Sequence, residues 1–279
     1  MNVDIPLGLW LVALAATALV TAVTCIGVLA THERAAARRV TAFLLAWLAA
    51  DVGLGLGGVF AATPSTDVPL IAAGIAVPAV AGCVLLTRRG TLRRLVDSMT
   101  LRRLVGLQAY RTAGIIFLVA WAAGRMPGIF ALPAGIGDIA VGLAAPFVAS
   151  RMDAGFDARL GAEPSPSPHG RAQARDDGRA RRLAIVWNVM GIADLVVAVT
   201  LGFLSSPSVF QQLAFDDPNT LVSRMPFVLI PTFAVPLSIV LHVAALLRLR
   251  ASGPARESAA PSGAVTASRW AIRSPGESR

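Results

Sequence analysis

The sequence predicts an all-α, polytopic membrane protein with seven transmembrane helices. Of its 279 residues, 55% are hydrophobic, and the mean hydropathy is +0.67. Charged residues make up 15% of the chain, against about 25% in an ordinary soluble domain. Seven apolar runs reach the length of about 20 residues that an α-helix needs to cross a bilayer, and arginines cluster between them.

The expected transmembrane domain covers residues 1–250. Its first apolar run has no basic segment before it and no small-residue cleavage site after it, so it is expected to remain as a helix. Only residues 125–128 separate the fourth run from the fifth. The predicted spans are residues 5–30, 40–62, 68–87, 104–124, 127–149, 183–204 and 225–247.

The connecting segments alternate in charge, and this alternation predicts the orientation of the chain. All 25 basic residues are arginines, so lysine chemistry such as a retinal Schiff base is excluded. The positive-inside rule gives an outside N-terminus and a cytoplasmic C-terminus. The expected location of such a multi-pass protein is the cell (inner) membrane. The net charge of +9 is explained by this placement, so no nucleic-acid partner is expected. Of the 25 arginines, 22 lie in segments 31–39, 88–103, 150–182 and 248–279.

Two cytoplasmic segments have low-complexity composition. Residues 160–182 form a Pro/Ser-rich stretch followed by an Arg/Asp run, and residues 251–279 form the C-terminal tail. Such compositions bury too little apolar surface to fold, so both segments are expected to be disordered linkers.

A perfect repeat, Thr-Leu-Arg-Arg-Leu-Val, occurs at 91–96 and again at 100–105. A spacing of nine residues is about 2.5 helical turns, so one continuous helix would place the copies on opposite faces. The first copy is therefore expected to lie in the membrane interface, and the second to open the fourth span. Anionic lipid headgroups are the candidate partner of residues 88–105, and a plain solvated basic turn is the alternative.

The second and sixth spans match in register, which suggests an internal duplication. An arginine pair precedes an aspartate by the same number of residues in both, and the same three residue types follow at the same offsets. Three helices, a linker helix and three more helices would result, as in transporters with parallel repeats. Chance similarity between Ala/Val/Leu-rich helices is the alternative. The matches are Arg38, Arg39, Asp51, Phe60, Pro64 and Ser65 with Arg181, Arg182, Asp194, Phe203, Pro207 and Ser208.

Six polar side chains within the spans are the candidate site. A carboxylate at the bilayer centre costs about 2.5–3.5 kcal/mol, which favours a functional role. In that role the aspartates bind a cation, a proton or a polar solute, and Arg111 is their counter-charge. The three aspartates are expected near the midplane, and the other three about 8–10 Å nearer the cytoplasm, from the helical rise. The alternative is helix-to-helix hydrogen bonding, with the arginine reaching toward the inner surface. The six are Asp51, Asp138, Asp194, Arg111, Asn188 and His242.

Catalytic and metal motifs are missing from the sequence. Cys25 and Cys83 form no Cys-x-x-Cys pair, and neither His-Glu-x-x-His nor Gly-x-Ser-x-Gly occurs. Only one histidine, His242, lies in a predicted span, so one chain cannot supply two membrane histidines to a haem iron, and no cofactor is expected. Gly135-Ile-Gly-Asp138 matches one half of the motif pair of intramembrane aspartic proteases, but the Tyr-Asp half is absent.

Several stretches resemble a family of bacterial multi-pass membrane proteins with no assigned activity, which implies a membrane protein without a stated mechanism. The three-one-three layout is also similar to sugar transporters of the SWEET type, although the Pro-Gln pair of PQ-loop proteins is absent. The stretches are Gln108-Ala-Tyr-Arg111, residues 132–139 with 142–146, residues 187–195, and residues 229–236 with His242.

The leading hypothesis is a carrier for a small polar solute or a cation, with proton coupling as an option. The alternative is a non-transporting assembly factor or sensor subunit whose aspartates pair helices, and a membrane enzyme is the third choice. Geometry distinguishes the first two, because a carrier needs its carboxylates beside a hydrated cavity, whereas a scaffold buries them in dry contacts.

Overall fold

The computed structural model describes residues 5–61, 69–160, 162–163 and 165–251, and over these ranges the chain is helical with no strand. Seven helices are long and apolar enough to cross a membrane, in agreement with the predicted number. They are Leu7–Leu29 (α1), Arg34–Leu56 (α2), Leu70–Thr87 (α3), Leu101–Ala122, Gly128–Ser150 (α7), Pro168–Ser205 (α9) and Ile230–Ala251.

Two of these seven are built from consecutive pieces. The fourth consists of α5 (Leu101–Leu107), a 3₁₀ helix η1 (Gln108–Gly114) and α6 (Ile115–Ala122), and the seventh of a π-helix η3 (Ile230–Ala234) and α10 (Val235–Ala251). Irregular backbone at membrane depth needs surrounding protein. Accordingly, about half of the apolar window is buried in the fourth (56%) and seventh (50%), against 11% in α2. Three short elements complete the chain: α4 (Thr91–Ser98), α8 (Phe156–Arg159) and η2 (Leu221–Ser223).

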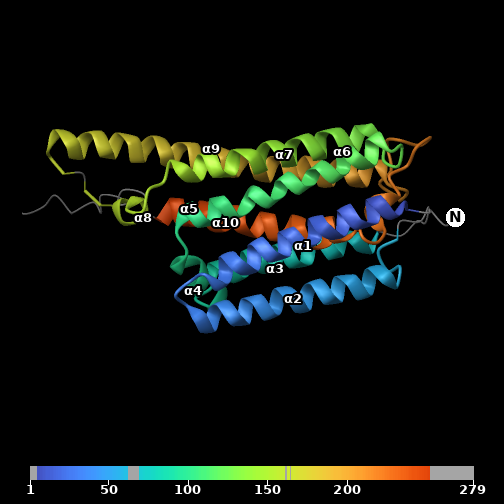
Figure 1. Ribbon diagram of the computed structural model, residues 1–279, viewed down its shortest axis with the longest axis horizontal. Helices are drawn as coiled ribbons and strands as arrows, with labels where there is room; N and C mark the ends of the chain where they lie inside the picture. Colours follow the sequence, from blue (N-terminus) through green and yellow to red (C-terminus); the bar gives the residue numbers. More distant parts are fainter. Residues whose placement is uncertain (1–4, 62–68, 161, 164, 252–279) are drawn as a thin grey trace, which may run out of the picture.

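The helices form an elongated bundle in which α2 lies at one edge and α7 with α9 at the other (Figure 1). Between them, α10 packs against α3, α9 and α5, while α7 packs along η1, α9 and α6. The start of α2, the short helices α4 and α8 and the end of α10 lie at the same end of the bundle, which is the arginine-rich end (Figure 1). The first residues of α1 lie at the opposite end (Figure 1).

The second span is displaced along the chain from its predicted position, 40–62. It begins at Arg34 and ends at Leu56. Gly57 and Gly58 follow, and Gly58 has a φ of +71°, a left-handed conformation that glycine adopts without a steric penalty. Val59 N–H then donates to the carbonyl of Leu54 at 3.0 Å, which closes the helix end. The helix stop is thus encoded by a glycine pair inside an apolar run.

The structure also differs from the prediction of disorder over 160–182, because residues 168–182 are the first four turns of α9. The Ser167 hydroxyl accepts a hydrogen bond from Gly170 N–H at 3.0 Å, and Pro168 occupies the first turn. Arg159 forms an ion pair with Asp177 at 2.7 Å. Ala, Arg and Gln are good helix formers, so low complexity here does not prevent a helix. The predicted disorder of the tail, 251–279, concerns residues that lie almost wholly outside those described.

The repeated hexapeptide forms two separate helices, as its spacing predicts. The first copy lies in α4 and the second in α5, with extended backbone at Met99 and Thr100 between them. The Thr100 hydroxyl caps α5 by accepting from Arg103 N–H at 3.2 Å. Leu95, Val96 and Met99 are buried, so α4 packs one apolar face on the bundle.

Candidate functional site

The candidate site is centred on Arg111, which η1 holds inside the bundle. Its side chain is 2% exposed, and each of its three guanidinium nitrogens has an acceptor. Nε donates to Asp138 Oδ1 at 2.7 Å, Nη1 donates to the Gly191 carbonyl at 3.1 Å, and Nη2 donates to Asp194 Oδ2. Nη1 also lies 3.2 Å from His242 Nε2. The guanidinium is therefore fully engaged, as a buried charge requires.

Two carboxylates share this guanidinium, one from α7 and one from α9. Asp138 Oδ1 lies 2.7 Å from Nη2 as well as from Nε. Both aspartate side chains are 17% exposed, whereas the arginine side chain is almost sealed. Each carboxylate thus contacts the arginine on one side and keeps some open space on the other.

A chain of hydrogen bonds fixes the histidine as a neutral ring. Asn188 Nδ2 donates to the Ala184 carbonyl at 2.7 Å, so the amide oxygen of Asn188 faces His242 Nδ1 at 2.9 Å. An amide oxygen only accepts, so Nδ1 carries the proton and Nε2 accepts from Arg111. Trp187 packs on the imidazole, with ring centroids 5.1 Å apart. His242 therefore orients the arginine without adding a charge.

Glycines allow these side chains to come together. A Cβ on Gly137 would lie 1.7 Å from Asp194 Oδ1, and one on Gly191 would lie 2.4 Å from the His242 ring. A Cβ on Gly114 would lie 2.3 Å from the Cβ of Asp138. The segment Gly135-Ile-Gly-Asp138 thus contributes the Asp138 carboxylate and, at Gly137, the space that the Asp194 carboxylate of α9 occupies.

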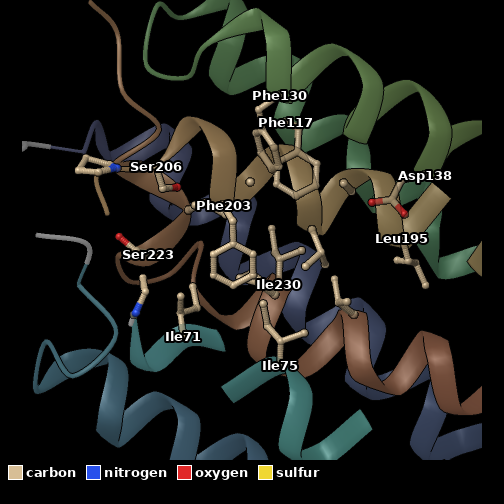
Figure 2. Close-up of a pocket in the computed structure, with 18 residues that line it drawn as sticks. Ile71, Ile75, Phe117, Phe130, Asp138, Leu195, Phe203, Ser206, Ser223 and Ile230 are labelled. Atoms are coloured by element: carbon tan, nitrogen blue, oxygen red, sulfur yellow. The ribbon is translucent and has the colours of Figure 1, made fainter. Parts of the chain in front are cut away.

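A cavity of about 60 Å³ leads from one end of the bundle to Asp138. Figure 2 shows Asp138 at one end of this cavity and Ser206 and Ser223 at the other, with phenylalanine side chains between. A second cavity, of about 40 Å³, is lined by Arg111, Tyr110 and again Asp138. One buried water needs about 10–15 Å³, so both cavities have room for a few water molecules. Asp138 lines both cavities and is the one ionisable side chain among the residues that they share.

Five of the six predicted residues therefore form one cluster, and Asp51 lies apart from it. Asp51 is 5% exposed on α2, with Trp47 and Thr232 as its polar neighbours. Its Oδ2 has no hydrogen-bond partner among the described residues. Asp51 and Asp194, equivalent in the proposed duplication, thus have different surroundings, and Pro64 and Ser65 fall outside the described residues. The duplication stays a prediction.

The prediction of two polar layers differs from the structure, which has one network. The helical rise locates Cα atoms, but the Arg111 side chain is long enough to reach the aspartates. Sequence reasoning also missed Ser238, whose hydroxyl lies 2.8 Å from the Tyr110 hydroxyl and whose carbonyl accepts from Gln108 Nε2 at 3.0 Å. Ser238 lies four residues before His242, on the same helix face, and that spacing was the available signal.

Comparison with protein families places this site within a known group of sequences. Residues 68–161 and 171–250 match the family described as "Domain of unknown function (DUF8737)". The chain belongs to this family. The DUF8737 match agrees with the resemblance to a family of no assigned activity and includes all five clustered residues, whereas Asp51 precedes it. No curated protein and no solved structure matches the chain.

Proposed function

We propose that this membrane protein is a carrier that binds a proton at Asp138, Arg111 and Asp194 and couples it to the passage of a small polar solute. The supporting observation is that two carboxylates from different helices share one buried guanidinium, and one of them borders both cavities. The proposal rests on charge balance, on ligand chemistry and on the helix breaks beside the cluster.

Charge balance gives the cluster one excess negative charge when both carboxylates are ionised. Arg111 contributes one positive charge, and the neutral His242 contributes none. An uncompensated charge at membrane depth is costly, so a proton or a cation should neutralise it. Binding and release of that species changes the net charge of the cluster between zero and minus one.

Ligand chemistry favours the proton over a metal ion. No group of three or more His, Cys, Asp or Glu side chains among the described residues could hold a metal. Calcium takes six to eight oxygen ligands, and here the guanidinium already occupies the space between the two carboxylates. A proton needs only one carboxylate oxygen.

The helix breaks fit a carrier as well. In many transporters, coupling-ion sites near the midplane are built from discontinuous helices. Here Arg111 lies in η1, and Phe233 and Ala234 of η3 line the cavity beside it. Cavities of about 60 and 40 Å³ are too small for a sugar or an amino acid, so passage of such a solute requires the helices to separate at these breaks.

The second candidate is a non-transporting subunit in which the cluster only ties helices together. The observation that favours it is the complete engagement of the guanidinium by groups from α7, α9 and α10. In that role the carboxylates would exchange no proton.

An infrared pH titration of the purified protein distinguishes the two. A carrier of the proposed kind shows the carbonyl stretch of a carboxyl that is still protonated where exposed carboxylic acids have already ionised. This band disappears as pH rises further and is lost in both Asp138→Asn and Asp194→Asn. The matched control is Asp176→Asn, an exposed carboxylate paired with Arg179, which should keep the signal. Identical titrations in wild type and both cluster variants would refute proton binding here and favour the scaffold.

Transport is tested in liposomes loaded with a pH-sensitive dye. Outward gradients of sugars, amino acids and organic cations are applied in turn. A solute that changes the internal pH with wild type but not with Asp138→Asn identifies the cargo. Solute flux that is unchanged in Asp138→Asn would remove the cluster from the transport mechanism.

A further inference from the structure

A larger cavity lies away from the ion-pair cluster, between α1, α2, α3, α4 and α10 at the arginine-rich end of the bundle. Its volume is about 390 Å³, within the range of about 300–1,000 Å³ that is usual for small-molecule sites. The walls are apolar, with Phe43 and Trp47 from α2, Leu85 from α3, and Leu237 and Leu241 from the seventh span. We call this the α2–α4 cavity.

The α2–α4 cavity exists because α2 is loosely packed. The buried residues of this helix are Ala36, Ala37, Leu44 and Asp51, and its larger side chains Val40, Trp47 and Leu48 pack against the core while only partly buried. Protein interiors contain few voids larger than a water molecule. An apolar gap of this size that faces the bilayer is therefore expected to hold hydrocarbon, and the nearest source is a lipid acyl chain.

The rim of the cavity is cationic. Arg39 lines it and is exposed, and Gly90 and Thr91, where α4 begins, line the same edge. Arg88 and Arg89, which immediately precede that edge, are exposed. Among the described residues of segment 88–97, one arginine, Arg93, forms an ion pair, with Asp97 at 2.8 Å. The rim thus keeps an excess of positive charge beside an apolar hollow.

We propose that the α2–α4 cavity binds one acyl chain of an anionic phospholipid and that Arg39 and the α3–α4 turn hold the headgroup phosphate. The combination of an apolar hollow with arginines at its mouth matches the two parts of such a lipid. This site is separate from the proton-binding cluster and stands whether or not the protein is a carrier.

The test is a lipid titration of the full-length protein in detergent, with Trp47 as the reporter. The probes are phosphatidylglycerol and phosphatidylcholine with the same brominated acyl chains, and a brominated fatty acid. Bromine quenches tryptophan at short range, so the part of the quenching that is lost in Trp47→Phe reports occupancy of the α2–α4 cavity. Phosphatidylglycerol is expected to quench at lower concentration than phosphatidylcholine.

Two variants separate the headgroup from the chain. Arg39→Gln should weaken binding of phosphatidylglycerol about fivefold, the effect of one basic residue near a membrane surface. It should weaken phosphatidylcholine less, because the choline cation offsets the phosphate charge of that lipid. The matched control, Arg38→Gln, removes a neighbouring exposed arginine that does not line the cavity and should have a smaller effect. Ala81→Leu narrows the cavity from α3 and should weaken both lipids, and Ala81→Val is the milder substitute if that variant does not fold.

Three results would overturn the proposal. Equal effects of Arg38→Gln and Arg39→Gln would show general charge attraction without a site. Unchanged quenching in both Ala81 variants would mean that no chain enters the cavity. Tighter binding of the fatty acid than of phosphatidylglycerol would identify a carboxylate ligand in place of a phospholipid.

Discussion

Arg111 determines the electrostatics of the candidate site, because it is the cation that both clustered carboxylates contact. Its planar guanidinium presents donors in a fixed fork, which lets one side chain bond Asp138, Asp194 and the Gly191 carbonyl at once. A lysine ammonium carries its three donors on one nitrogen, so it could not span the same set of acceptors.

Removal of Arg111 is expected to destabilise the protein strongly. Arg111→Met leaves two carboxylates together without a cation, and loss of one partner of a buried ion pair costs about 3–5 kcal/mol. Asp138→Asn and Asp194→Asn, added to Arg111→Met, should restore much of that loss, because the repelling charges disappear. Arg111→Lys should be intermediate. Thermal unfolding in detergent compares these three variants with the wild type, and a wild-type transition temperature for Arg111→Met would contradict this account.

At the residue scale, the sequence indicated which types of side chain form ion pairs, but it did not indicate which helices are adjacent. The charged side chains of the spans predicted that Arg111 pairs with aspartates, and two of the three do. Asp51 has the same offset from an arginine pair as Asp194, yet it lies apart. Position along a helix follows from residue spacing, whereas the identity of the adjacent helix depends on packing of the whole bundle.

The packing of α7 shows how small residues position the site at the scale of helices. Gly135 and Gly142 lie seven residues apart on one face, and a Cβ on Gly142 would lie 2.5 Å from the backbone nitrogen of Thr112 in η1. The backbones of α7 and η1 are therefore in direct contact, as small residues permit in membrane proteins. Asp138 lies on that same face, between the two glycines.

Gly137→Ala tests the contact between α7 and α9. The new methyl group would displace the Asp194 carboxylate, so a loss of about 1–3 kcal/mol is expected from overpacking. Gly53→Ala is the matched control, since Gly53 is also in a transmembrane helix and no neighbouring atom lies within 4 Å of the place that its new methyl group would take. Alanine there should be neutral or stabilise by about 0.5–1 kcal/mol. Equal unfolding temperatures for the two variants would mean that α7 and α9 do not pack as described.

Among the elements, apolar length predicted the seven spans, and the nine-residue repeat predicted the break between α4 and α5. Four prolines deep within the spans, Pro78, Pro133, Pro231 and Pro236, are candidate breaks in the helices. Irregular backbone is found at the start of the seventh span, in η3, whereas Pro78 and Pro133 lie inside the α-helices α3 and α7. The 3₁₀ helix η1 contains no proline, so nothing local predicts it. The 3₁₀ conformation of η1 coincides with its close packing on α7. That contact joins distant parts of the chain, so the local sequence does not reveal it.

For the whole molecule, the structure gathers the arginine-rich segments at one end of the bundle (Figure 1), and their charge predicts which side of the membrane that end faces. The orientation matters for both proposals. It would open the cavity beside Asp138 toward the outside and expose the α2–α4 cavity to the inner leaflet, where anionic lipids interact with basic residues.

Cysteine accessibility in intact cells tests this orientation. In a variant with Cys25→Ala and Cys83→Ala, Asp217→Cys places a thiol on the exposed loop after α9, and Ala172→Cys places one on the exposed start of α9 at the opposite end. A membrane-impermeant maleimide should label Asp217→Cys in intact cells and Ala172→Cys only after permeabilisation. The reverse pattern would place the arginine-rich end outside, so that the cavity beside Asp138 would open to the cytoplasm and protons would reach the cluster from that side.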